Sequence, residues 1–114
     1  MTTIYHNPRC SKSRATLALL RERGVEAEVV EYLSAPPDAA LLRSLAAMLG
    51  GSARDLIRDG EAEYRELGLG DASLSEAALI AAVAANPKLL QRPIVVHRGK
   101  AAIGRPPENV LAIL

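Results

Sequence analysis

The first third of the chain has the hydrophobic pattern of a strand, a helix and a second strand. Thr2–Tyr5 is short and rich in β-branched and aromatic residues, which favours a strand. From Ser11 to Arg23 apolar residues recur at helical spacing, and Gly24 is a suitable stop. Ala27–Tyr32 has the composition of a second strand. This order predicts a parallel pair of strands joined by a right-handed helical crossover.

The middle of the chain has the pattern of several short helices. Pro36 and Pro37 prevent a strand from continuing, and Asp38 is suited to cap the helix that follows. Glycines, or the pair Asn86-Pro87, mark the helix ends. The predicted helices cover Ala39–Leu49, Ala53–Arg58, Glu61–Leu67 and Glu76–Asn86. We interpret residues 38–91 as a helical insertion between the two halves of a sheet.

The last part of the chain returns to a strand pattern. Ile94–His97 and Lys100–Ile103 have strand composition, and Arg98-Gly99 between them suits a hairpin turn. A final helix is expected over Glu108–Leu114. The order β-α-β, helical block, β-β-α resembles a thioredoxin-like fold. We therefore predict an α/β protein with a mixed four-stranded sheet, forming a single domain over residues 1–114.

In thioredoxin-like folds a cis-proline commonly precedes the third strand and faces the reactive thiol. Arg92-Pro93 stands directly before the predicted strand Ile94–His97. An X-Pro bond is the one peptide bond for which the cis form costs little. A cis peptide bond is therefore expected between Arg92 and Pro93.

Composition limits the classes of function. The chain has 114 residues, of which 49% are hydrophobic, so it can form one aliphatic core. Its 14 basic and 13 acidic residues nearly balance, which argues against a nucleic-acid partner. It has no apolar run long enough to cross a membrane, and its start lacks the pattern of a signal peptide. A cytoplasmic protein is expected, and the single cysteine fits a reducing compartment.

Cys10 is the candidate reactive group. It lies at the predicted strand-to-helix turn, among Arg9, Lys12 and Arg14. Positive charge and the free N–H groups of a helix start lower the pKa of a thiol, and the same donors can hold an oxyanion. A lone cysteine is most often a small buried apolar residue. The polar residues on both sides of Cys10 argue against that reading.

A set of short motifs runs over nearly the whole chain. The motifs are Tyr5–Arg14, Tyr32-Leu33 with Pro36-Pro37, Arg54–Arg58, Tyr64 with Glu66–Leu69, Asn86-Pro87, Arg92–Val96 and Gly104–Pro106. In this order they resemble the arsenate reductases of the ArsC family that are coupled to glutaredoxin. The segment around Cys10 and the segment Arg92-Pro93-Ile94-Val95-Val96 carry the most specific part of the resemblance.

The resemblance implies a role for each matching residue. Cys10 would be the nucleophile that forms a thiol–arsenate adduct on the way to arsenite, a reaction of arsenic detoxification. His6 would help lower the pKa of Cys10, and Ser13 would donate a hydrogen bond to the thiolate. Three arginines would converge on Cys10 to bind the oxyanion, since guanidinium groups match oxyanion geometry. These are Arg58, Arg92 and Arg105.

The single cysteine requires an external source of electrons. No second cysteine is present to resolve an adduct on Cys10, so other thiols must reduce it. The resemblance suggests glutathione as the co-substrate and glutaredoxin as the protein partner. No bound cofactor is expected. His6, Cys10 and His97 do not have the spacing of metal ligands, so no metal is expected either.

Two other functions remain open. A thiolate of low pKa is also suited to a thiol-dependent reductase or transferase that acts on another substrate through a mixed disulfide. A non-enzymatic regulator similar to Spx, which binds RNA polymerase, is the third reading. The segment Cys10-Ser11-Lys12-Ser13 lacks the second cysteine of a Cys-x-x-Cys switch. That absence and the three arginines favour the reductase.

Overall fold

The computed structural model describes all 114 residues and divides into two compact units. Met1–Ala35 and Arg92–Leu114 form the first unit, and Pro36–Gln91 forms the second. The second unit has nearly the bounds expected for the helical insertion. The expectation of one domain over residues 1–114 stays a prediction.

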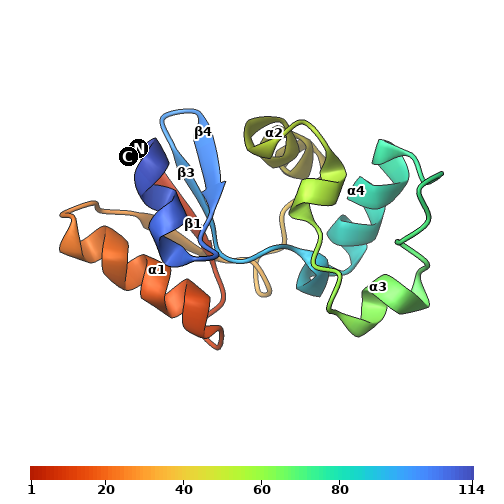
Figure 1. Cartoon of the computed structure of the whole chain (residues 1–114), viewed down its shortest axis with the longest axis horizontal. Coiled ribbons are helices and arrows are strands. Elements are labelled where there is room, and N and C mark those ends of the chain that lie inside the picture. Colours follow the sequence, from red (N-terminus) through yellow and green to blue (C-terminus); the bar gives the residue numbers. More distant parts are fainter. The chain divides into compact units, whose positions relative to one another are not determined.

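The first unit is built on a four-stranded sheet (Figure 1). Its strands are β1 (Thr2–His6), β2 (Glu28–Glu31), β3 (Ile94–His97) and β4 (Lys100–Ile103). Their order across the sheet is β2-β1-β3-β4. β1 pairs with β2 in parallel and with β3 antiparallel, and β4 pairs antiparallel with β3. The helix α1 (Ser11–Glu22) joins the parallel pair. The predicted mixed sheet and thioredoxin-like α/β fold are confirmed.

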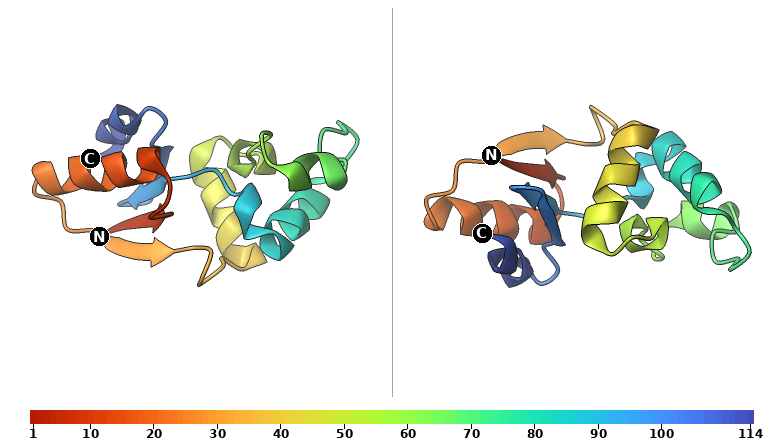
Figure 2. Two further views of the ribbon diagram at one scale, coloured as in Figure 1. Left: turned by 90° about the horizontal axis from the view of Figure 1, so that it is seen from below. Right: turned by 90° about the horizontal axis from the view of Figure 1, so that it is seen from above.

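Two helices cover one face of this sheet. Ile4 and Val95 are cross-strand partners on β1 and β3, and both side chains are fully buried. They pack with Leu20 of α1 and with Val110 of η3 (Pro107–Ile113). Figure 2 shows α1 and η3 on the same side of the strands. This core holds α1 and η3 against the sheet.

The C-terminal helix differs from the prediction of an α-helix over Glu108–Leu114. η3 is a 3-10 helix, in which the Asn109 N–H donates to the Pro106 carbonyl at 3.0 Å. The Leu114 N–H likewise donates to the carbonyl three residues back, that of Leu111, at 3.4 Å. The expectation of an α-helix there was therefore wrong in helix type, although the segment is helical.

Both turn predictions in the first unit hold. Arg98 and Gly99 have positive φ angles of 50° and 78°, as a two-residue hairpin of type I′ requires. Gly24 has a φ angle of 70° just after α1, where a left-handed residue commonly ends a helix.

The cis peptide bond expected at Arg92-Pro93 is present, and Arg105-Pro106 is a second one that was not predicted.

The second unit is helical. Its elements are α2 (Ala39–Leu49), η1 (Ala53–Leu56), α3 (Ala62–Glu66), α4 (Glu76–Ala85) and η2 (Pro87–Leu89). Asp38 caps α2 as predicted, since its carboxylate accepts from the Leu41 N–H at 2.8 Å. η1 is shorter than the predicted Ala53–Arg58 helix because Ile57 becomes extended and forms an antiparallel bridge with Leu90.

Two charged side chains hold the loops of the second unit. The Arg54 guanidinium donates to the carbonyl oxygens of Leu69 and Asp71 at 2.8 and 2.6 Å. Glu76, in the first turn of α4, accepts from the Ala53 N–H at 2.8 Å. These bonds connect η1 with the loop after α3 and with the first turn of α4.

No helix in the chain is long and apolar enough to cross a bilayer.

Gly104→Ala should destabilise the protein. A Cβ at this position would collide with Thr16, and it would lie 2.8 Å from Cγ of Pro93. Thr16 is fully buried and cannot move aside easily. We expect a loss of about 1–3 kcal/mol in the free energy of unfolding, measured by urea denaturation.

Gly60→Ala is the matched control, because its Cβ would meet no atom within 4 Å. It should change the free energy of unfolding by less than about 0.5 kcal/mol. Equal losses in the two variants would contradict the close packing around Gly104.

Candidate active site

Cys10 lies where β1 passes into α1. Its extended backbone, with φ −93° and ψ 123°, makes it the N-cap residue of the helix. The Cys10 N–H donates to the Asn7 carbonyl at 3.0 Å, and the Cys10 carbonyl accepts from the Arg14 N–H at 3.0 Å. Asn7 Oδ1 also accepts from the Arg9 N–H at 3.0 Å. This tight turn places a half-buried thiol at the start of a helix, as predicted.

The surroundings of the sulfur favour the thiolate. Burial raises the pKa of Cys10, but hydrogen bonds from the Ser13 backbone, the Arg92 side chain and the Lys12 backbone outweigh it. The charge of Arg92 acts in the same direction. The net pKa of Cys10 is below its usual range. A thiolate is the nucleophilic form of cysteine, so these donors activate the group.

His6 and Ser13 lie beside Cys10, and their side chains contact each other. His6 Nδ1 and Ser13 Oγ are 2.6 Å apart, and Ser13 Oγ accepts from the Asn7 N–H at 3.0 Å. The Ser13 hydroxyl therefore bonds to His6 and Asn7, and it is the backbone N–H of Ser13 that bonds to the sulfur. The reason is local: the hydroxyl satisfies the polar groups at the end of β1, and all three residues are buried.

His6 does not act as a cation beside the sulfur. Burial lowers the pKa of His6, Glu31 partly opposes this, and Arg21 and Arg14 lower it further. His6 is accordingly neutral at neutral pH and is not among the groups that shift the pKa of Cys10. Its bond to Ser13 instead connects the end of β1 with the first turn of α1.

Two of the three predicted arginines lie in the first unit. Arg92, which precedes the cis-proline, hydrogen-bonds to the Cys10 sulfur. Arg105 is exposed, and its Nη1 donates to the Arg92 carbonyl at 3.5 Å. The Gly104 N–H donates to the Pro93 carbonyl at 2.9 Å and so keeps the segment before Arg105 beside Pro93.

The third predicted arginine lies in the second unit. The Arg58 N–H donates to the Leu89 carbonyl at 2.8 Å, which fixes its backbone there. Its Nη1 is buried and makes no hydrogen bond. The convergence of Arg58 on Cys10 stays a prediction.

Sequence reasoning assigned no role to Asn7. Its amide oxygen and its backbone both support the loop that presents Cys10. A signal for it was present, because Asn followed by Pro is typical of a turn in which the Asn side chain bonds to the backbone two residues ahead. Asn7 therefore shapes the site without contributing charge.

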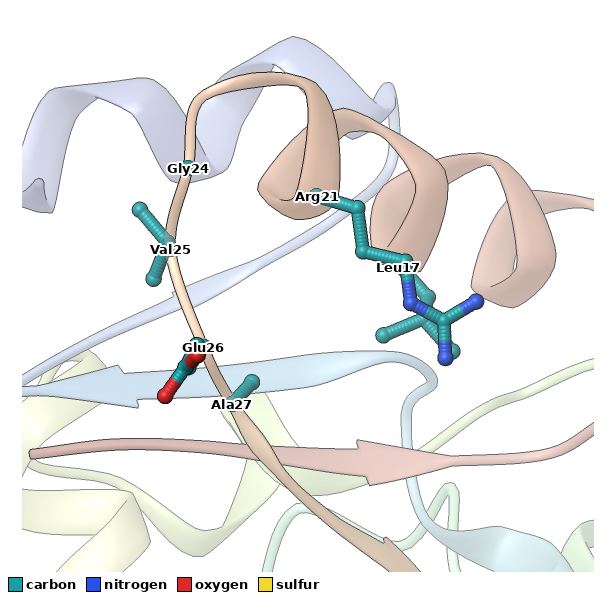
Figure 3. Close-up of a pocket in the computed structure, with 6 residues that line it drawn as sticks. All are labelled: Leu17, Arg21, Gly24, Val25, Glu26 and Ala27. Carbon is teal, nitrogen blue, oxygen red and sulfur yellow. The ribbon is translucent and has the colours of Figure 1, made fainter.

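Two cavities lie in the first unit. One, of about 330 Å³, adjoins the Cys10 loop and is lined by His6, Asn7, Pro8, Arg9, Glu31, Leu33 and Ser34. The other, of about 430 Å³, lies between the end of α1 and the segment that leads into β2 (Figure 3). Because β1 and β2 are parallel, the start of β2 lies at the opposite end of the sheet from Cys10. The first cavity is thus the one that belongs to the candidate active site.

The fold and the site together define a class of protein. A thiol at a helix start, beside a cis-proline and an arginine on a mixed four-stranded sheet, is the arrangement of a thioredoxin-like protein with one activated cysteine. Residues 5–113 match the family model described as the ArsC family, and the chain belongs to that family. No group of three or more His, Cys, Asp and Glu side chains is placed to hold a metal ion.

The relatives agree with this assignment over nearly the whole chain. The chain is 65% identical over 112 residues to the uncharacterised protein YfgD of Escherichia coli K12, which covers 97% of this chain and 94% of that protein. It is 54% identical over 112 residues to a Neisseria meningitidis serogroup A protein named arsenate reductase, covering 97% and 96%. The solved structure of an arsenate reductase from Vibrio cholerae superposes with a TM-score of 0.96 at 52% identity, covering 99% of this chain and 97% of that one.

Arg92→Gln should raise the pKa of Cys10, because it removes a charged donor from the thiolate. The rate of alkylation by iodoacetamide, followed as a function of pH, should therefore reach its midpoint at a higher pH than in the wild type. At neutral pH the variant should react more slowly.

Arg14→Gln is the control for this experiment. Arg14 Nη1 donates to the Pro8 carbonyl at 3.0 Å and is not among the groups that shift the pKa of Cys10. Its alkylation midpoint should match the wild type. A wild-type midpoint in Arg92→Gln as well would show that Arg92 does not stabilise the thiolate.

Proposed function

We propose that this protein reduces arsenate to arsenite, with Cys10 as the nucleophile and external thiols as the reductant. The observation that carries the proposal is a thiolate held by Arg92 and by the backbone N–H groups of Lys12 and Ser13. The same donors suit an anionic, tetrahedral substrate. The names of the Neisseria and Vibrio relatives support arsenate as that substrate.

The first step is attack of the Cys10 thiolate on arsenic. An S–As bond forms and an As–O bond breaks, and the departing oxygen leaves as water after it takes up protons. Both reactants carry negative charge, so the step needs cations close to the sulfur. Arg92 meets this requirement in the structure. We propose that Arg105 and Arg58 complete the oxyanion site, since each guanidinium offers paired donors to anionic oxygens.

The second step is reduction of the adduct by thiols from outside the chain. Arsenic(V) accepts two electrons to become arsenic(III), and two thiols supply them as they join in one disulfide. Cys10 has no partner cysteine in this chain, so it regains its thiol only through another molecule. We propose glutathione and glutaredoxin as these reductants. We also propose that the protein acts in the cytoplasm, where the glutathione pool keeps thiols reduced.

The 330 Å³ cavity beside the Cys10 loop supports the approach of glutathione there. Its wall includes a cation, Arg9, an anion, Glu31, and an exposed apolar side chain, Leu33. Glutathione carries carboxylates, an ammonium group and an uncharged middle, which these three side chains complement. A thiol bound in this cavity would lie beside the residues that precede Cys10.

A second candidate function is a thiol transferase that acts through a mixed disulfide on Cys10. The observation that favours it is the combination of partial exposure and a lowered pKa at this thiol. The same features speed thiol–disulfide exchange. The candidate needs no oxyanion site, so the arginines would then have no part in the reaction.

Cys10→Ser should abolish arsenate reduction, because a serine hydroxyl is not ionised at neutral pH and cannot form the adduct. The measurement is arsenite produced from arsenate with glutathione, glutaredoxin and a system that regenerates them. The wild type should also produce none when both thiols are omitted. Turnover by Cys10→Ser, or by the wild type without thiols, would contradict the mechanism.

Arg105→Gln should weaken the use of arsenate without deactivating the thiol. Loss of one charged hydrogen bond to the oxyanion predicts a fall of about 10- to 100-fold in kcat/KM for arsenate. The alkylation rate of Cys10 should stay close to that of the wild type. Arg98→Gln, at the exposed hairpin turn, is the control and should keep full activity. Parallel losses of reduction and alkylation in Arg105→Gln would argue against an oxyanion role.

A further inference from the structure

Tyr32 lies in a row of three residues just beyond the strand ends that meet at the Cys10 loop. β1 and β2 pair in parallel up to His6 and Glu31, so the next residues, Asn7 and Tyr32, are neighbours. β1 and β3 pair antiparallel with Tyr5 opposite Ile94, and the same register sets Asn7 opposite Arg92. The sheet order β2-β1-β3 therefore brings Tyr32, Asn7 and Arg92 together at the candidate active site.

The hydroxyl hydrogen of Tyr32 is buried without an acceptor. The whole side chain is fully buried, and its oxygen makes no hydrogen bond of good geometry, although the side chains of Asn7 and Arg92 lie near it as donors. Buried hydroxyls almost always have a partner, so an exception needs an explanation.

The neighbours of this hydroxyl are the groups of the active site. Burial raises the pKa of Tyr32. The charge of Arg92, and hydrogen bonding from the Asn7 and Arg92 side chains toward the hydroxyl oxygen, lower it, and the charge of Cys10 raises it again. The net pKa is raised, so the oxygen keeps its hydrogen at neutral pH. Tyr32 is thus an uncharged donor held close to Arg92 and Cys10.

The protein offers this hydrogen few acceptors. A guanidinium has donors only, so Arg92 cannot accept it. Asn7 Oδ1 already accepts from the Arg9 N–H at 3.0 Å. The hydroxyl is not among the groups that hydrogen-bond to the Cys10 sulfur. An anion bound at Cys10 is the acceptor that would complete its hydrogen bonding.

We propose that Tyr32 is a further binding residue of the oxyanion site, whose neutral hydroxyl donates a hydrogen bond to an oxygen of the anion held beside Cys10 and Arg92. This inference rests on the proposed function for the identity of the substrate. It assigns to Tyr32 a contact with the substrate in addition to its packing. The arginines supply positive charge to the oxyanion site. The Tyr32 hydroxyl adds one uncharged, directional hydrogen bond to the anion.

The test compares Tyr32→Phe with Tyr64→Phe, since each removes a single hydroxyl. Tyr64 lies on α3 in the second unit. Inorganic phosphate serves as the probe because it has the shape and charge of arsenate and is not reduced. The readout is protection of Cys10 from iodoacetamide as phosphate is added. Melting temperature and the alkylation rate without phosphate report on the fold and on the thiol.

Tyr32→Phe should raise the phosphate concentration for half-protection by about 10- to 100-fold, the effect of losing a hydrogen bond to a charged group. Its melting temperature and its unprotected alkylation rate should match the wild type, and Tyr64→Phe should match it in all three. An unchanged half-protection concentration in Tyr32→Phe overturns the proposal. So does equal weakening in both variants.

Assays of arsenate reduction distinguish a failure of the Tyr32 proposal from a failure of the proposed function. Tyr32→Phe should lower kcat/KM for arsenate by the same factor, and Tyr64→Phe should not. A wild type that phosphate protects through Tyr32 but that produces no arsenite would overturn arsenate reduction and support the Tyr32 contact. A wild type that phosphate does not protect and that produces no arsenite would overturn both.

Discussion

The site depends on stabilising one negative charge, that of the Cys10 thiolate, in a half-buried position. Burial alone would favour the neutral thiol. Two backbone N–H groups at the start of α1 and the Arg92 guanidinium reverse this preference. Much of the surrounding structure serves to keep these donors in place. The bond between His6 and Ser13 connects β1 to the first turn of α1, and the Asn7 amide holds the turn between them.

The sheet brings donors from distant parts of the sequence to this turn. β1 is central, with β2 parallel on one side and β3 antiparallel on the other. The end of β2 and the start of β3 therefore both lie beside the end of β1. Tyr32 and Arg92 reach the Cys10 loop for this reason, although 60 positions of sequence, residue 32 to residue 92, separate them. The hydrogen bond from Gly104 to Pro93 extends the arrangement to Arg105.

Local signals in the sequence were sufficient for most of the fold and for the location of the thiol. Asp38 and Gly50 bound α2 where capping and glycine chemistry predict, and Arg98-Gly99 forms the expected turn. Predictions were less accurate where tertiary contacts decide. Ile57 pairs with Leu90 and ends η1 early, and the contact between the Ser13 hydroxyl and His6 was not predicted. The burial of Tyr32 follows from strand register, which residue spacing does not reveal.

The central claim is that the folded protein lowers the pKa of Cys10 below that of an ordinary cysteine. The most direct measurement is a pH titration of thiolate absorbance in the wild type, with Cys10→Ser as the blank that removes the contribution of the tyrosines. The account predicts a midpoint clearly below that of an ordinary cysteine, which returns toward the ordinary value when the protein is unfolded in urea. A midpoint at or above the ordinary value in the folded protein would contradict the account, because burial would then outweigh Arg92 and the helix start.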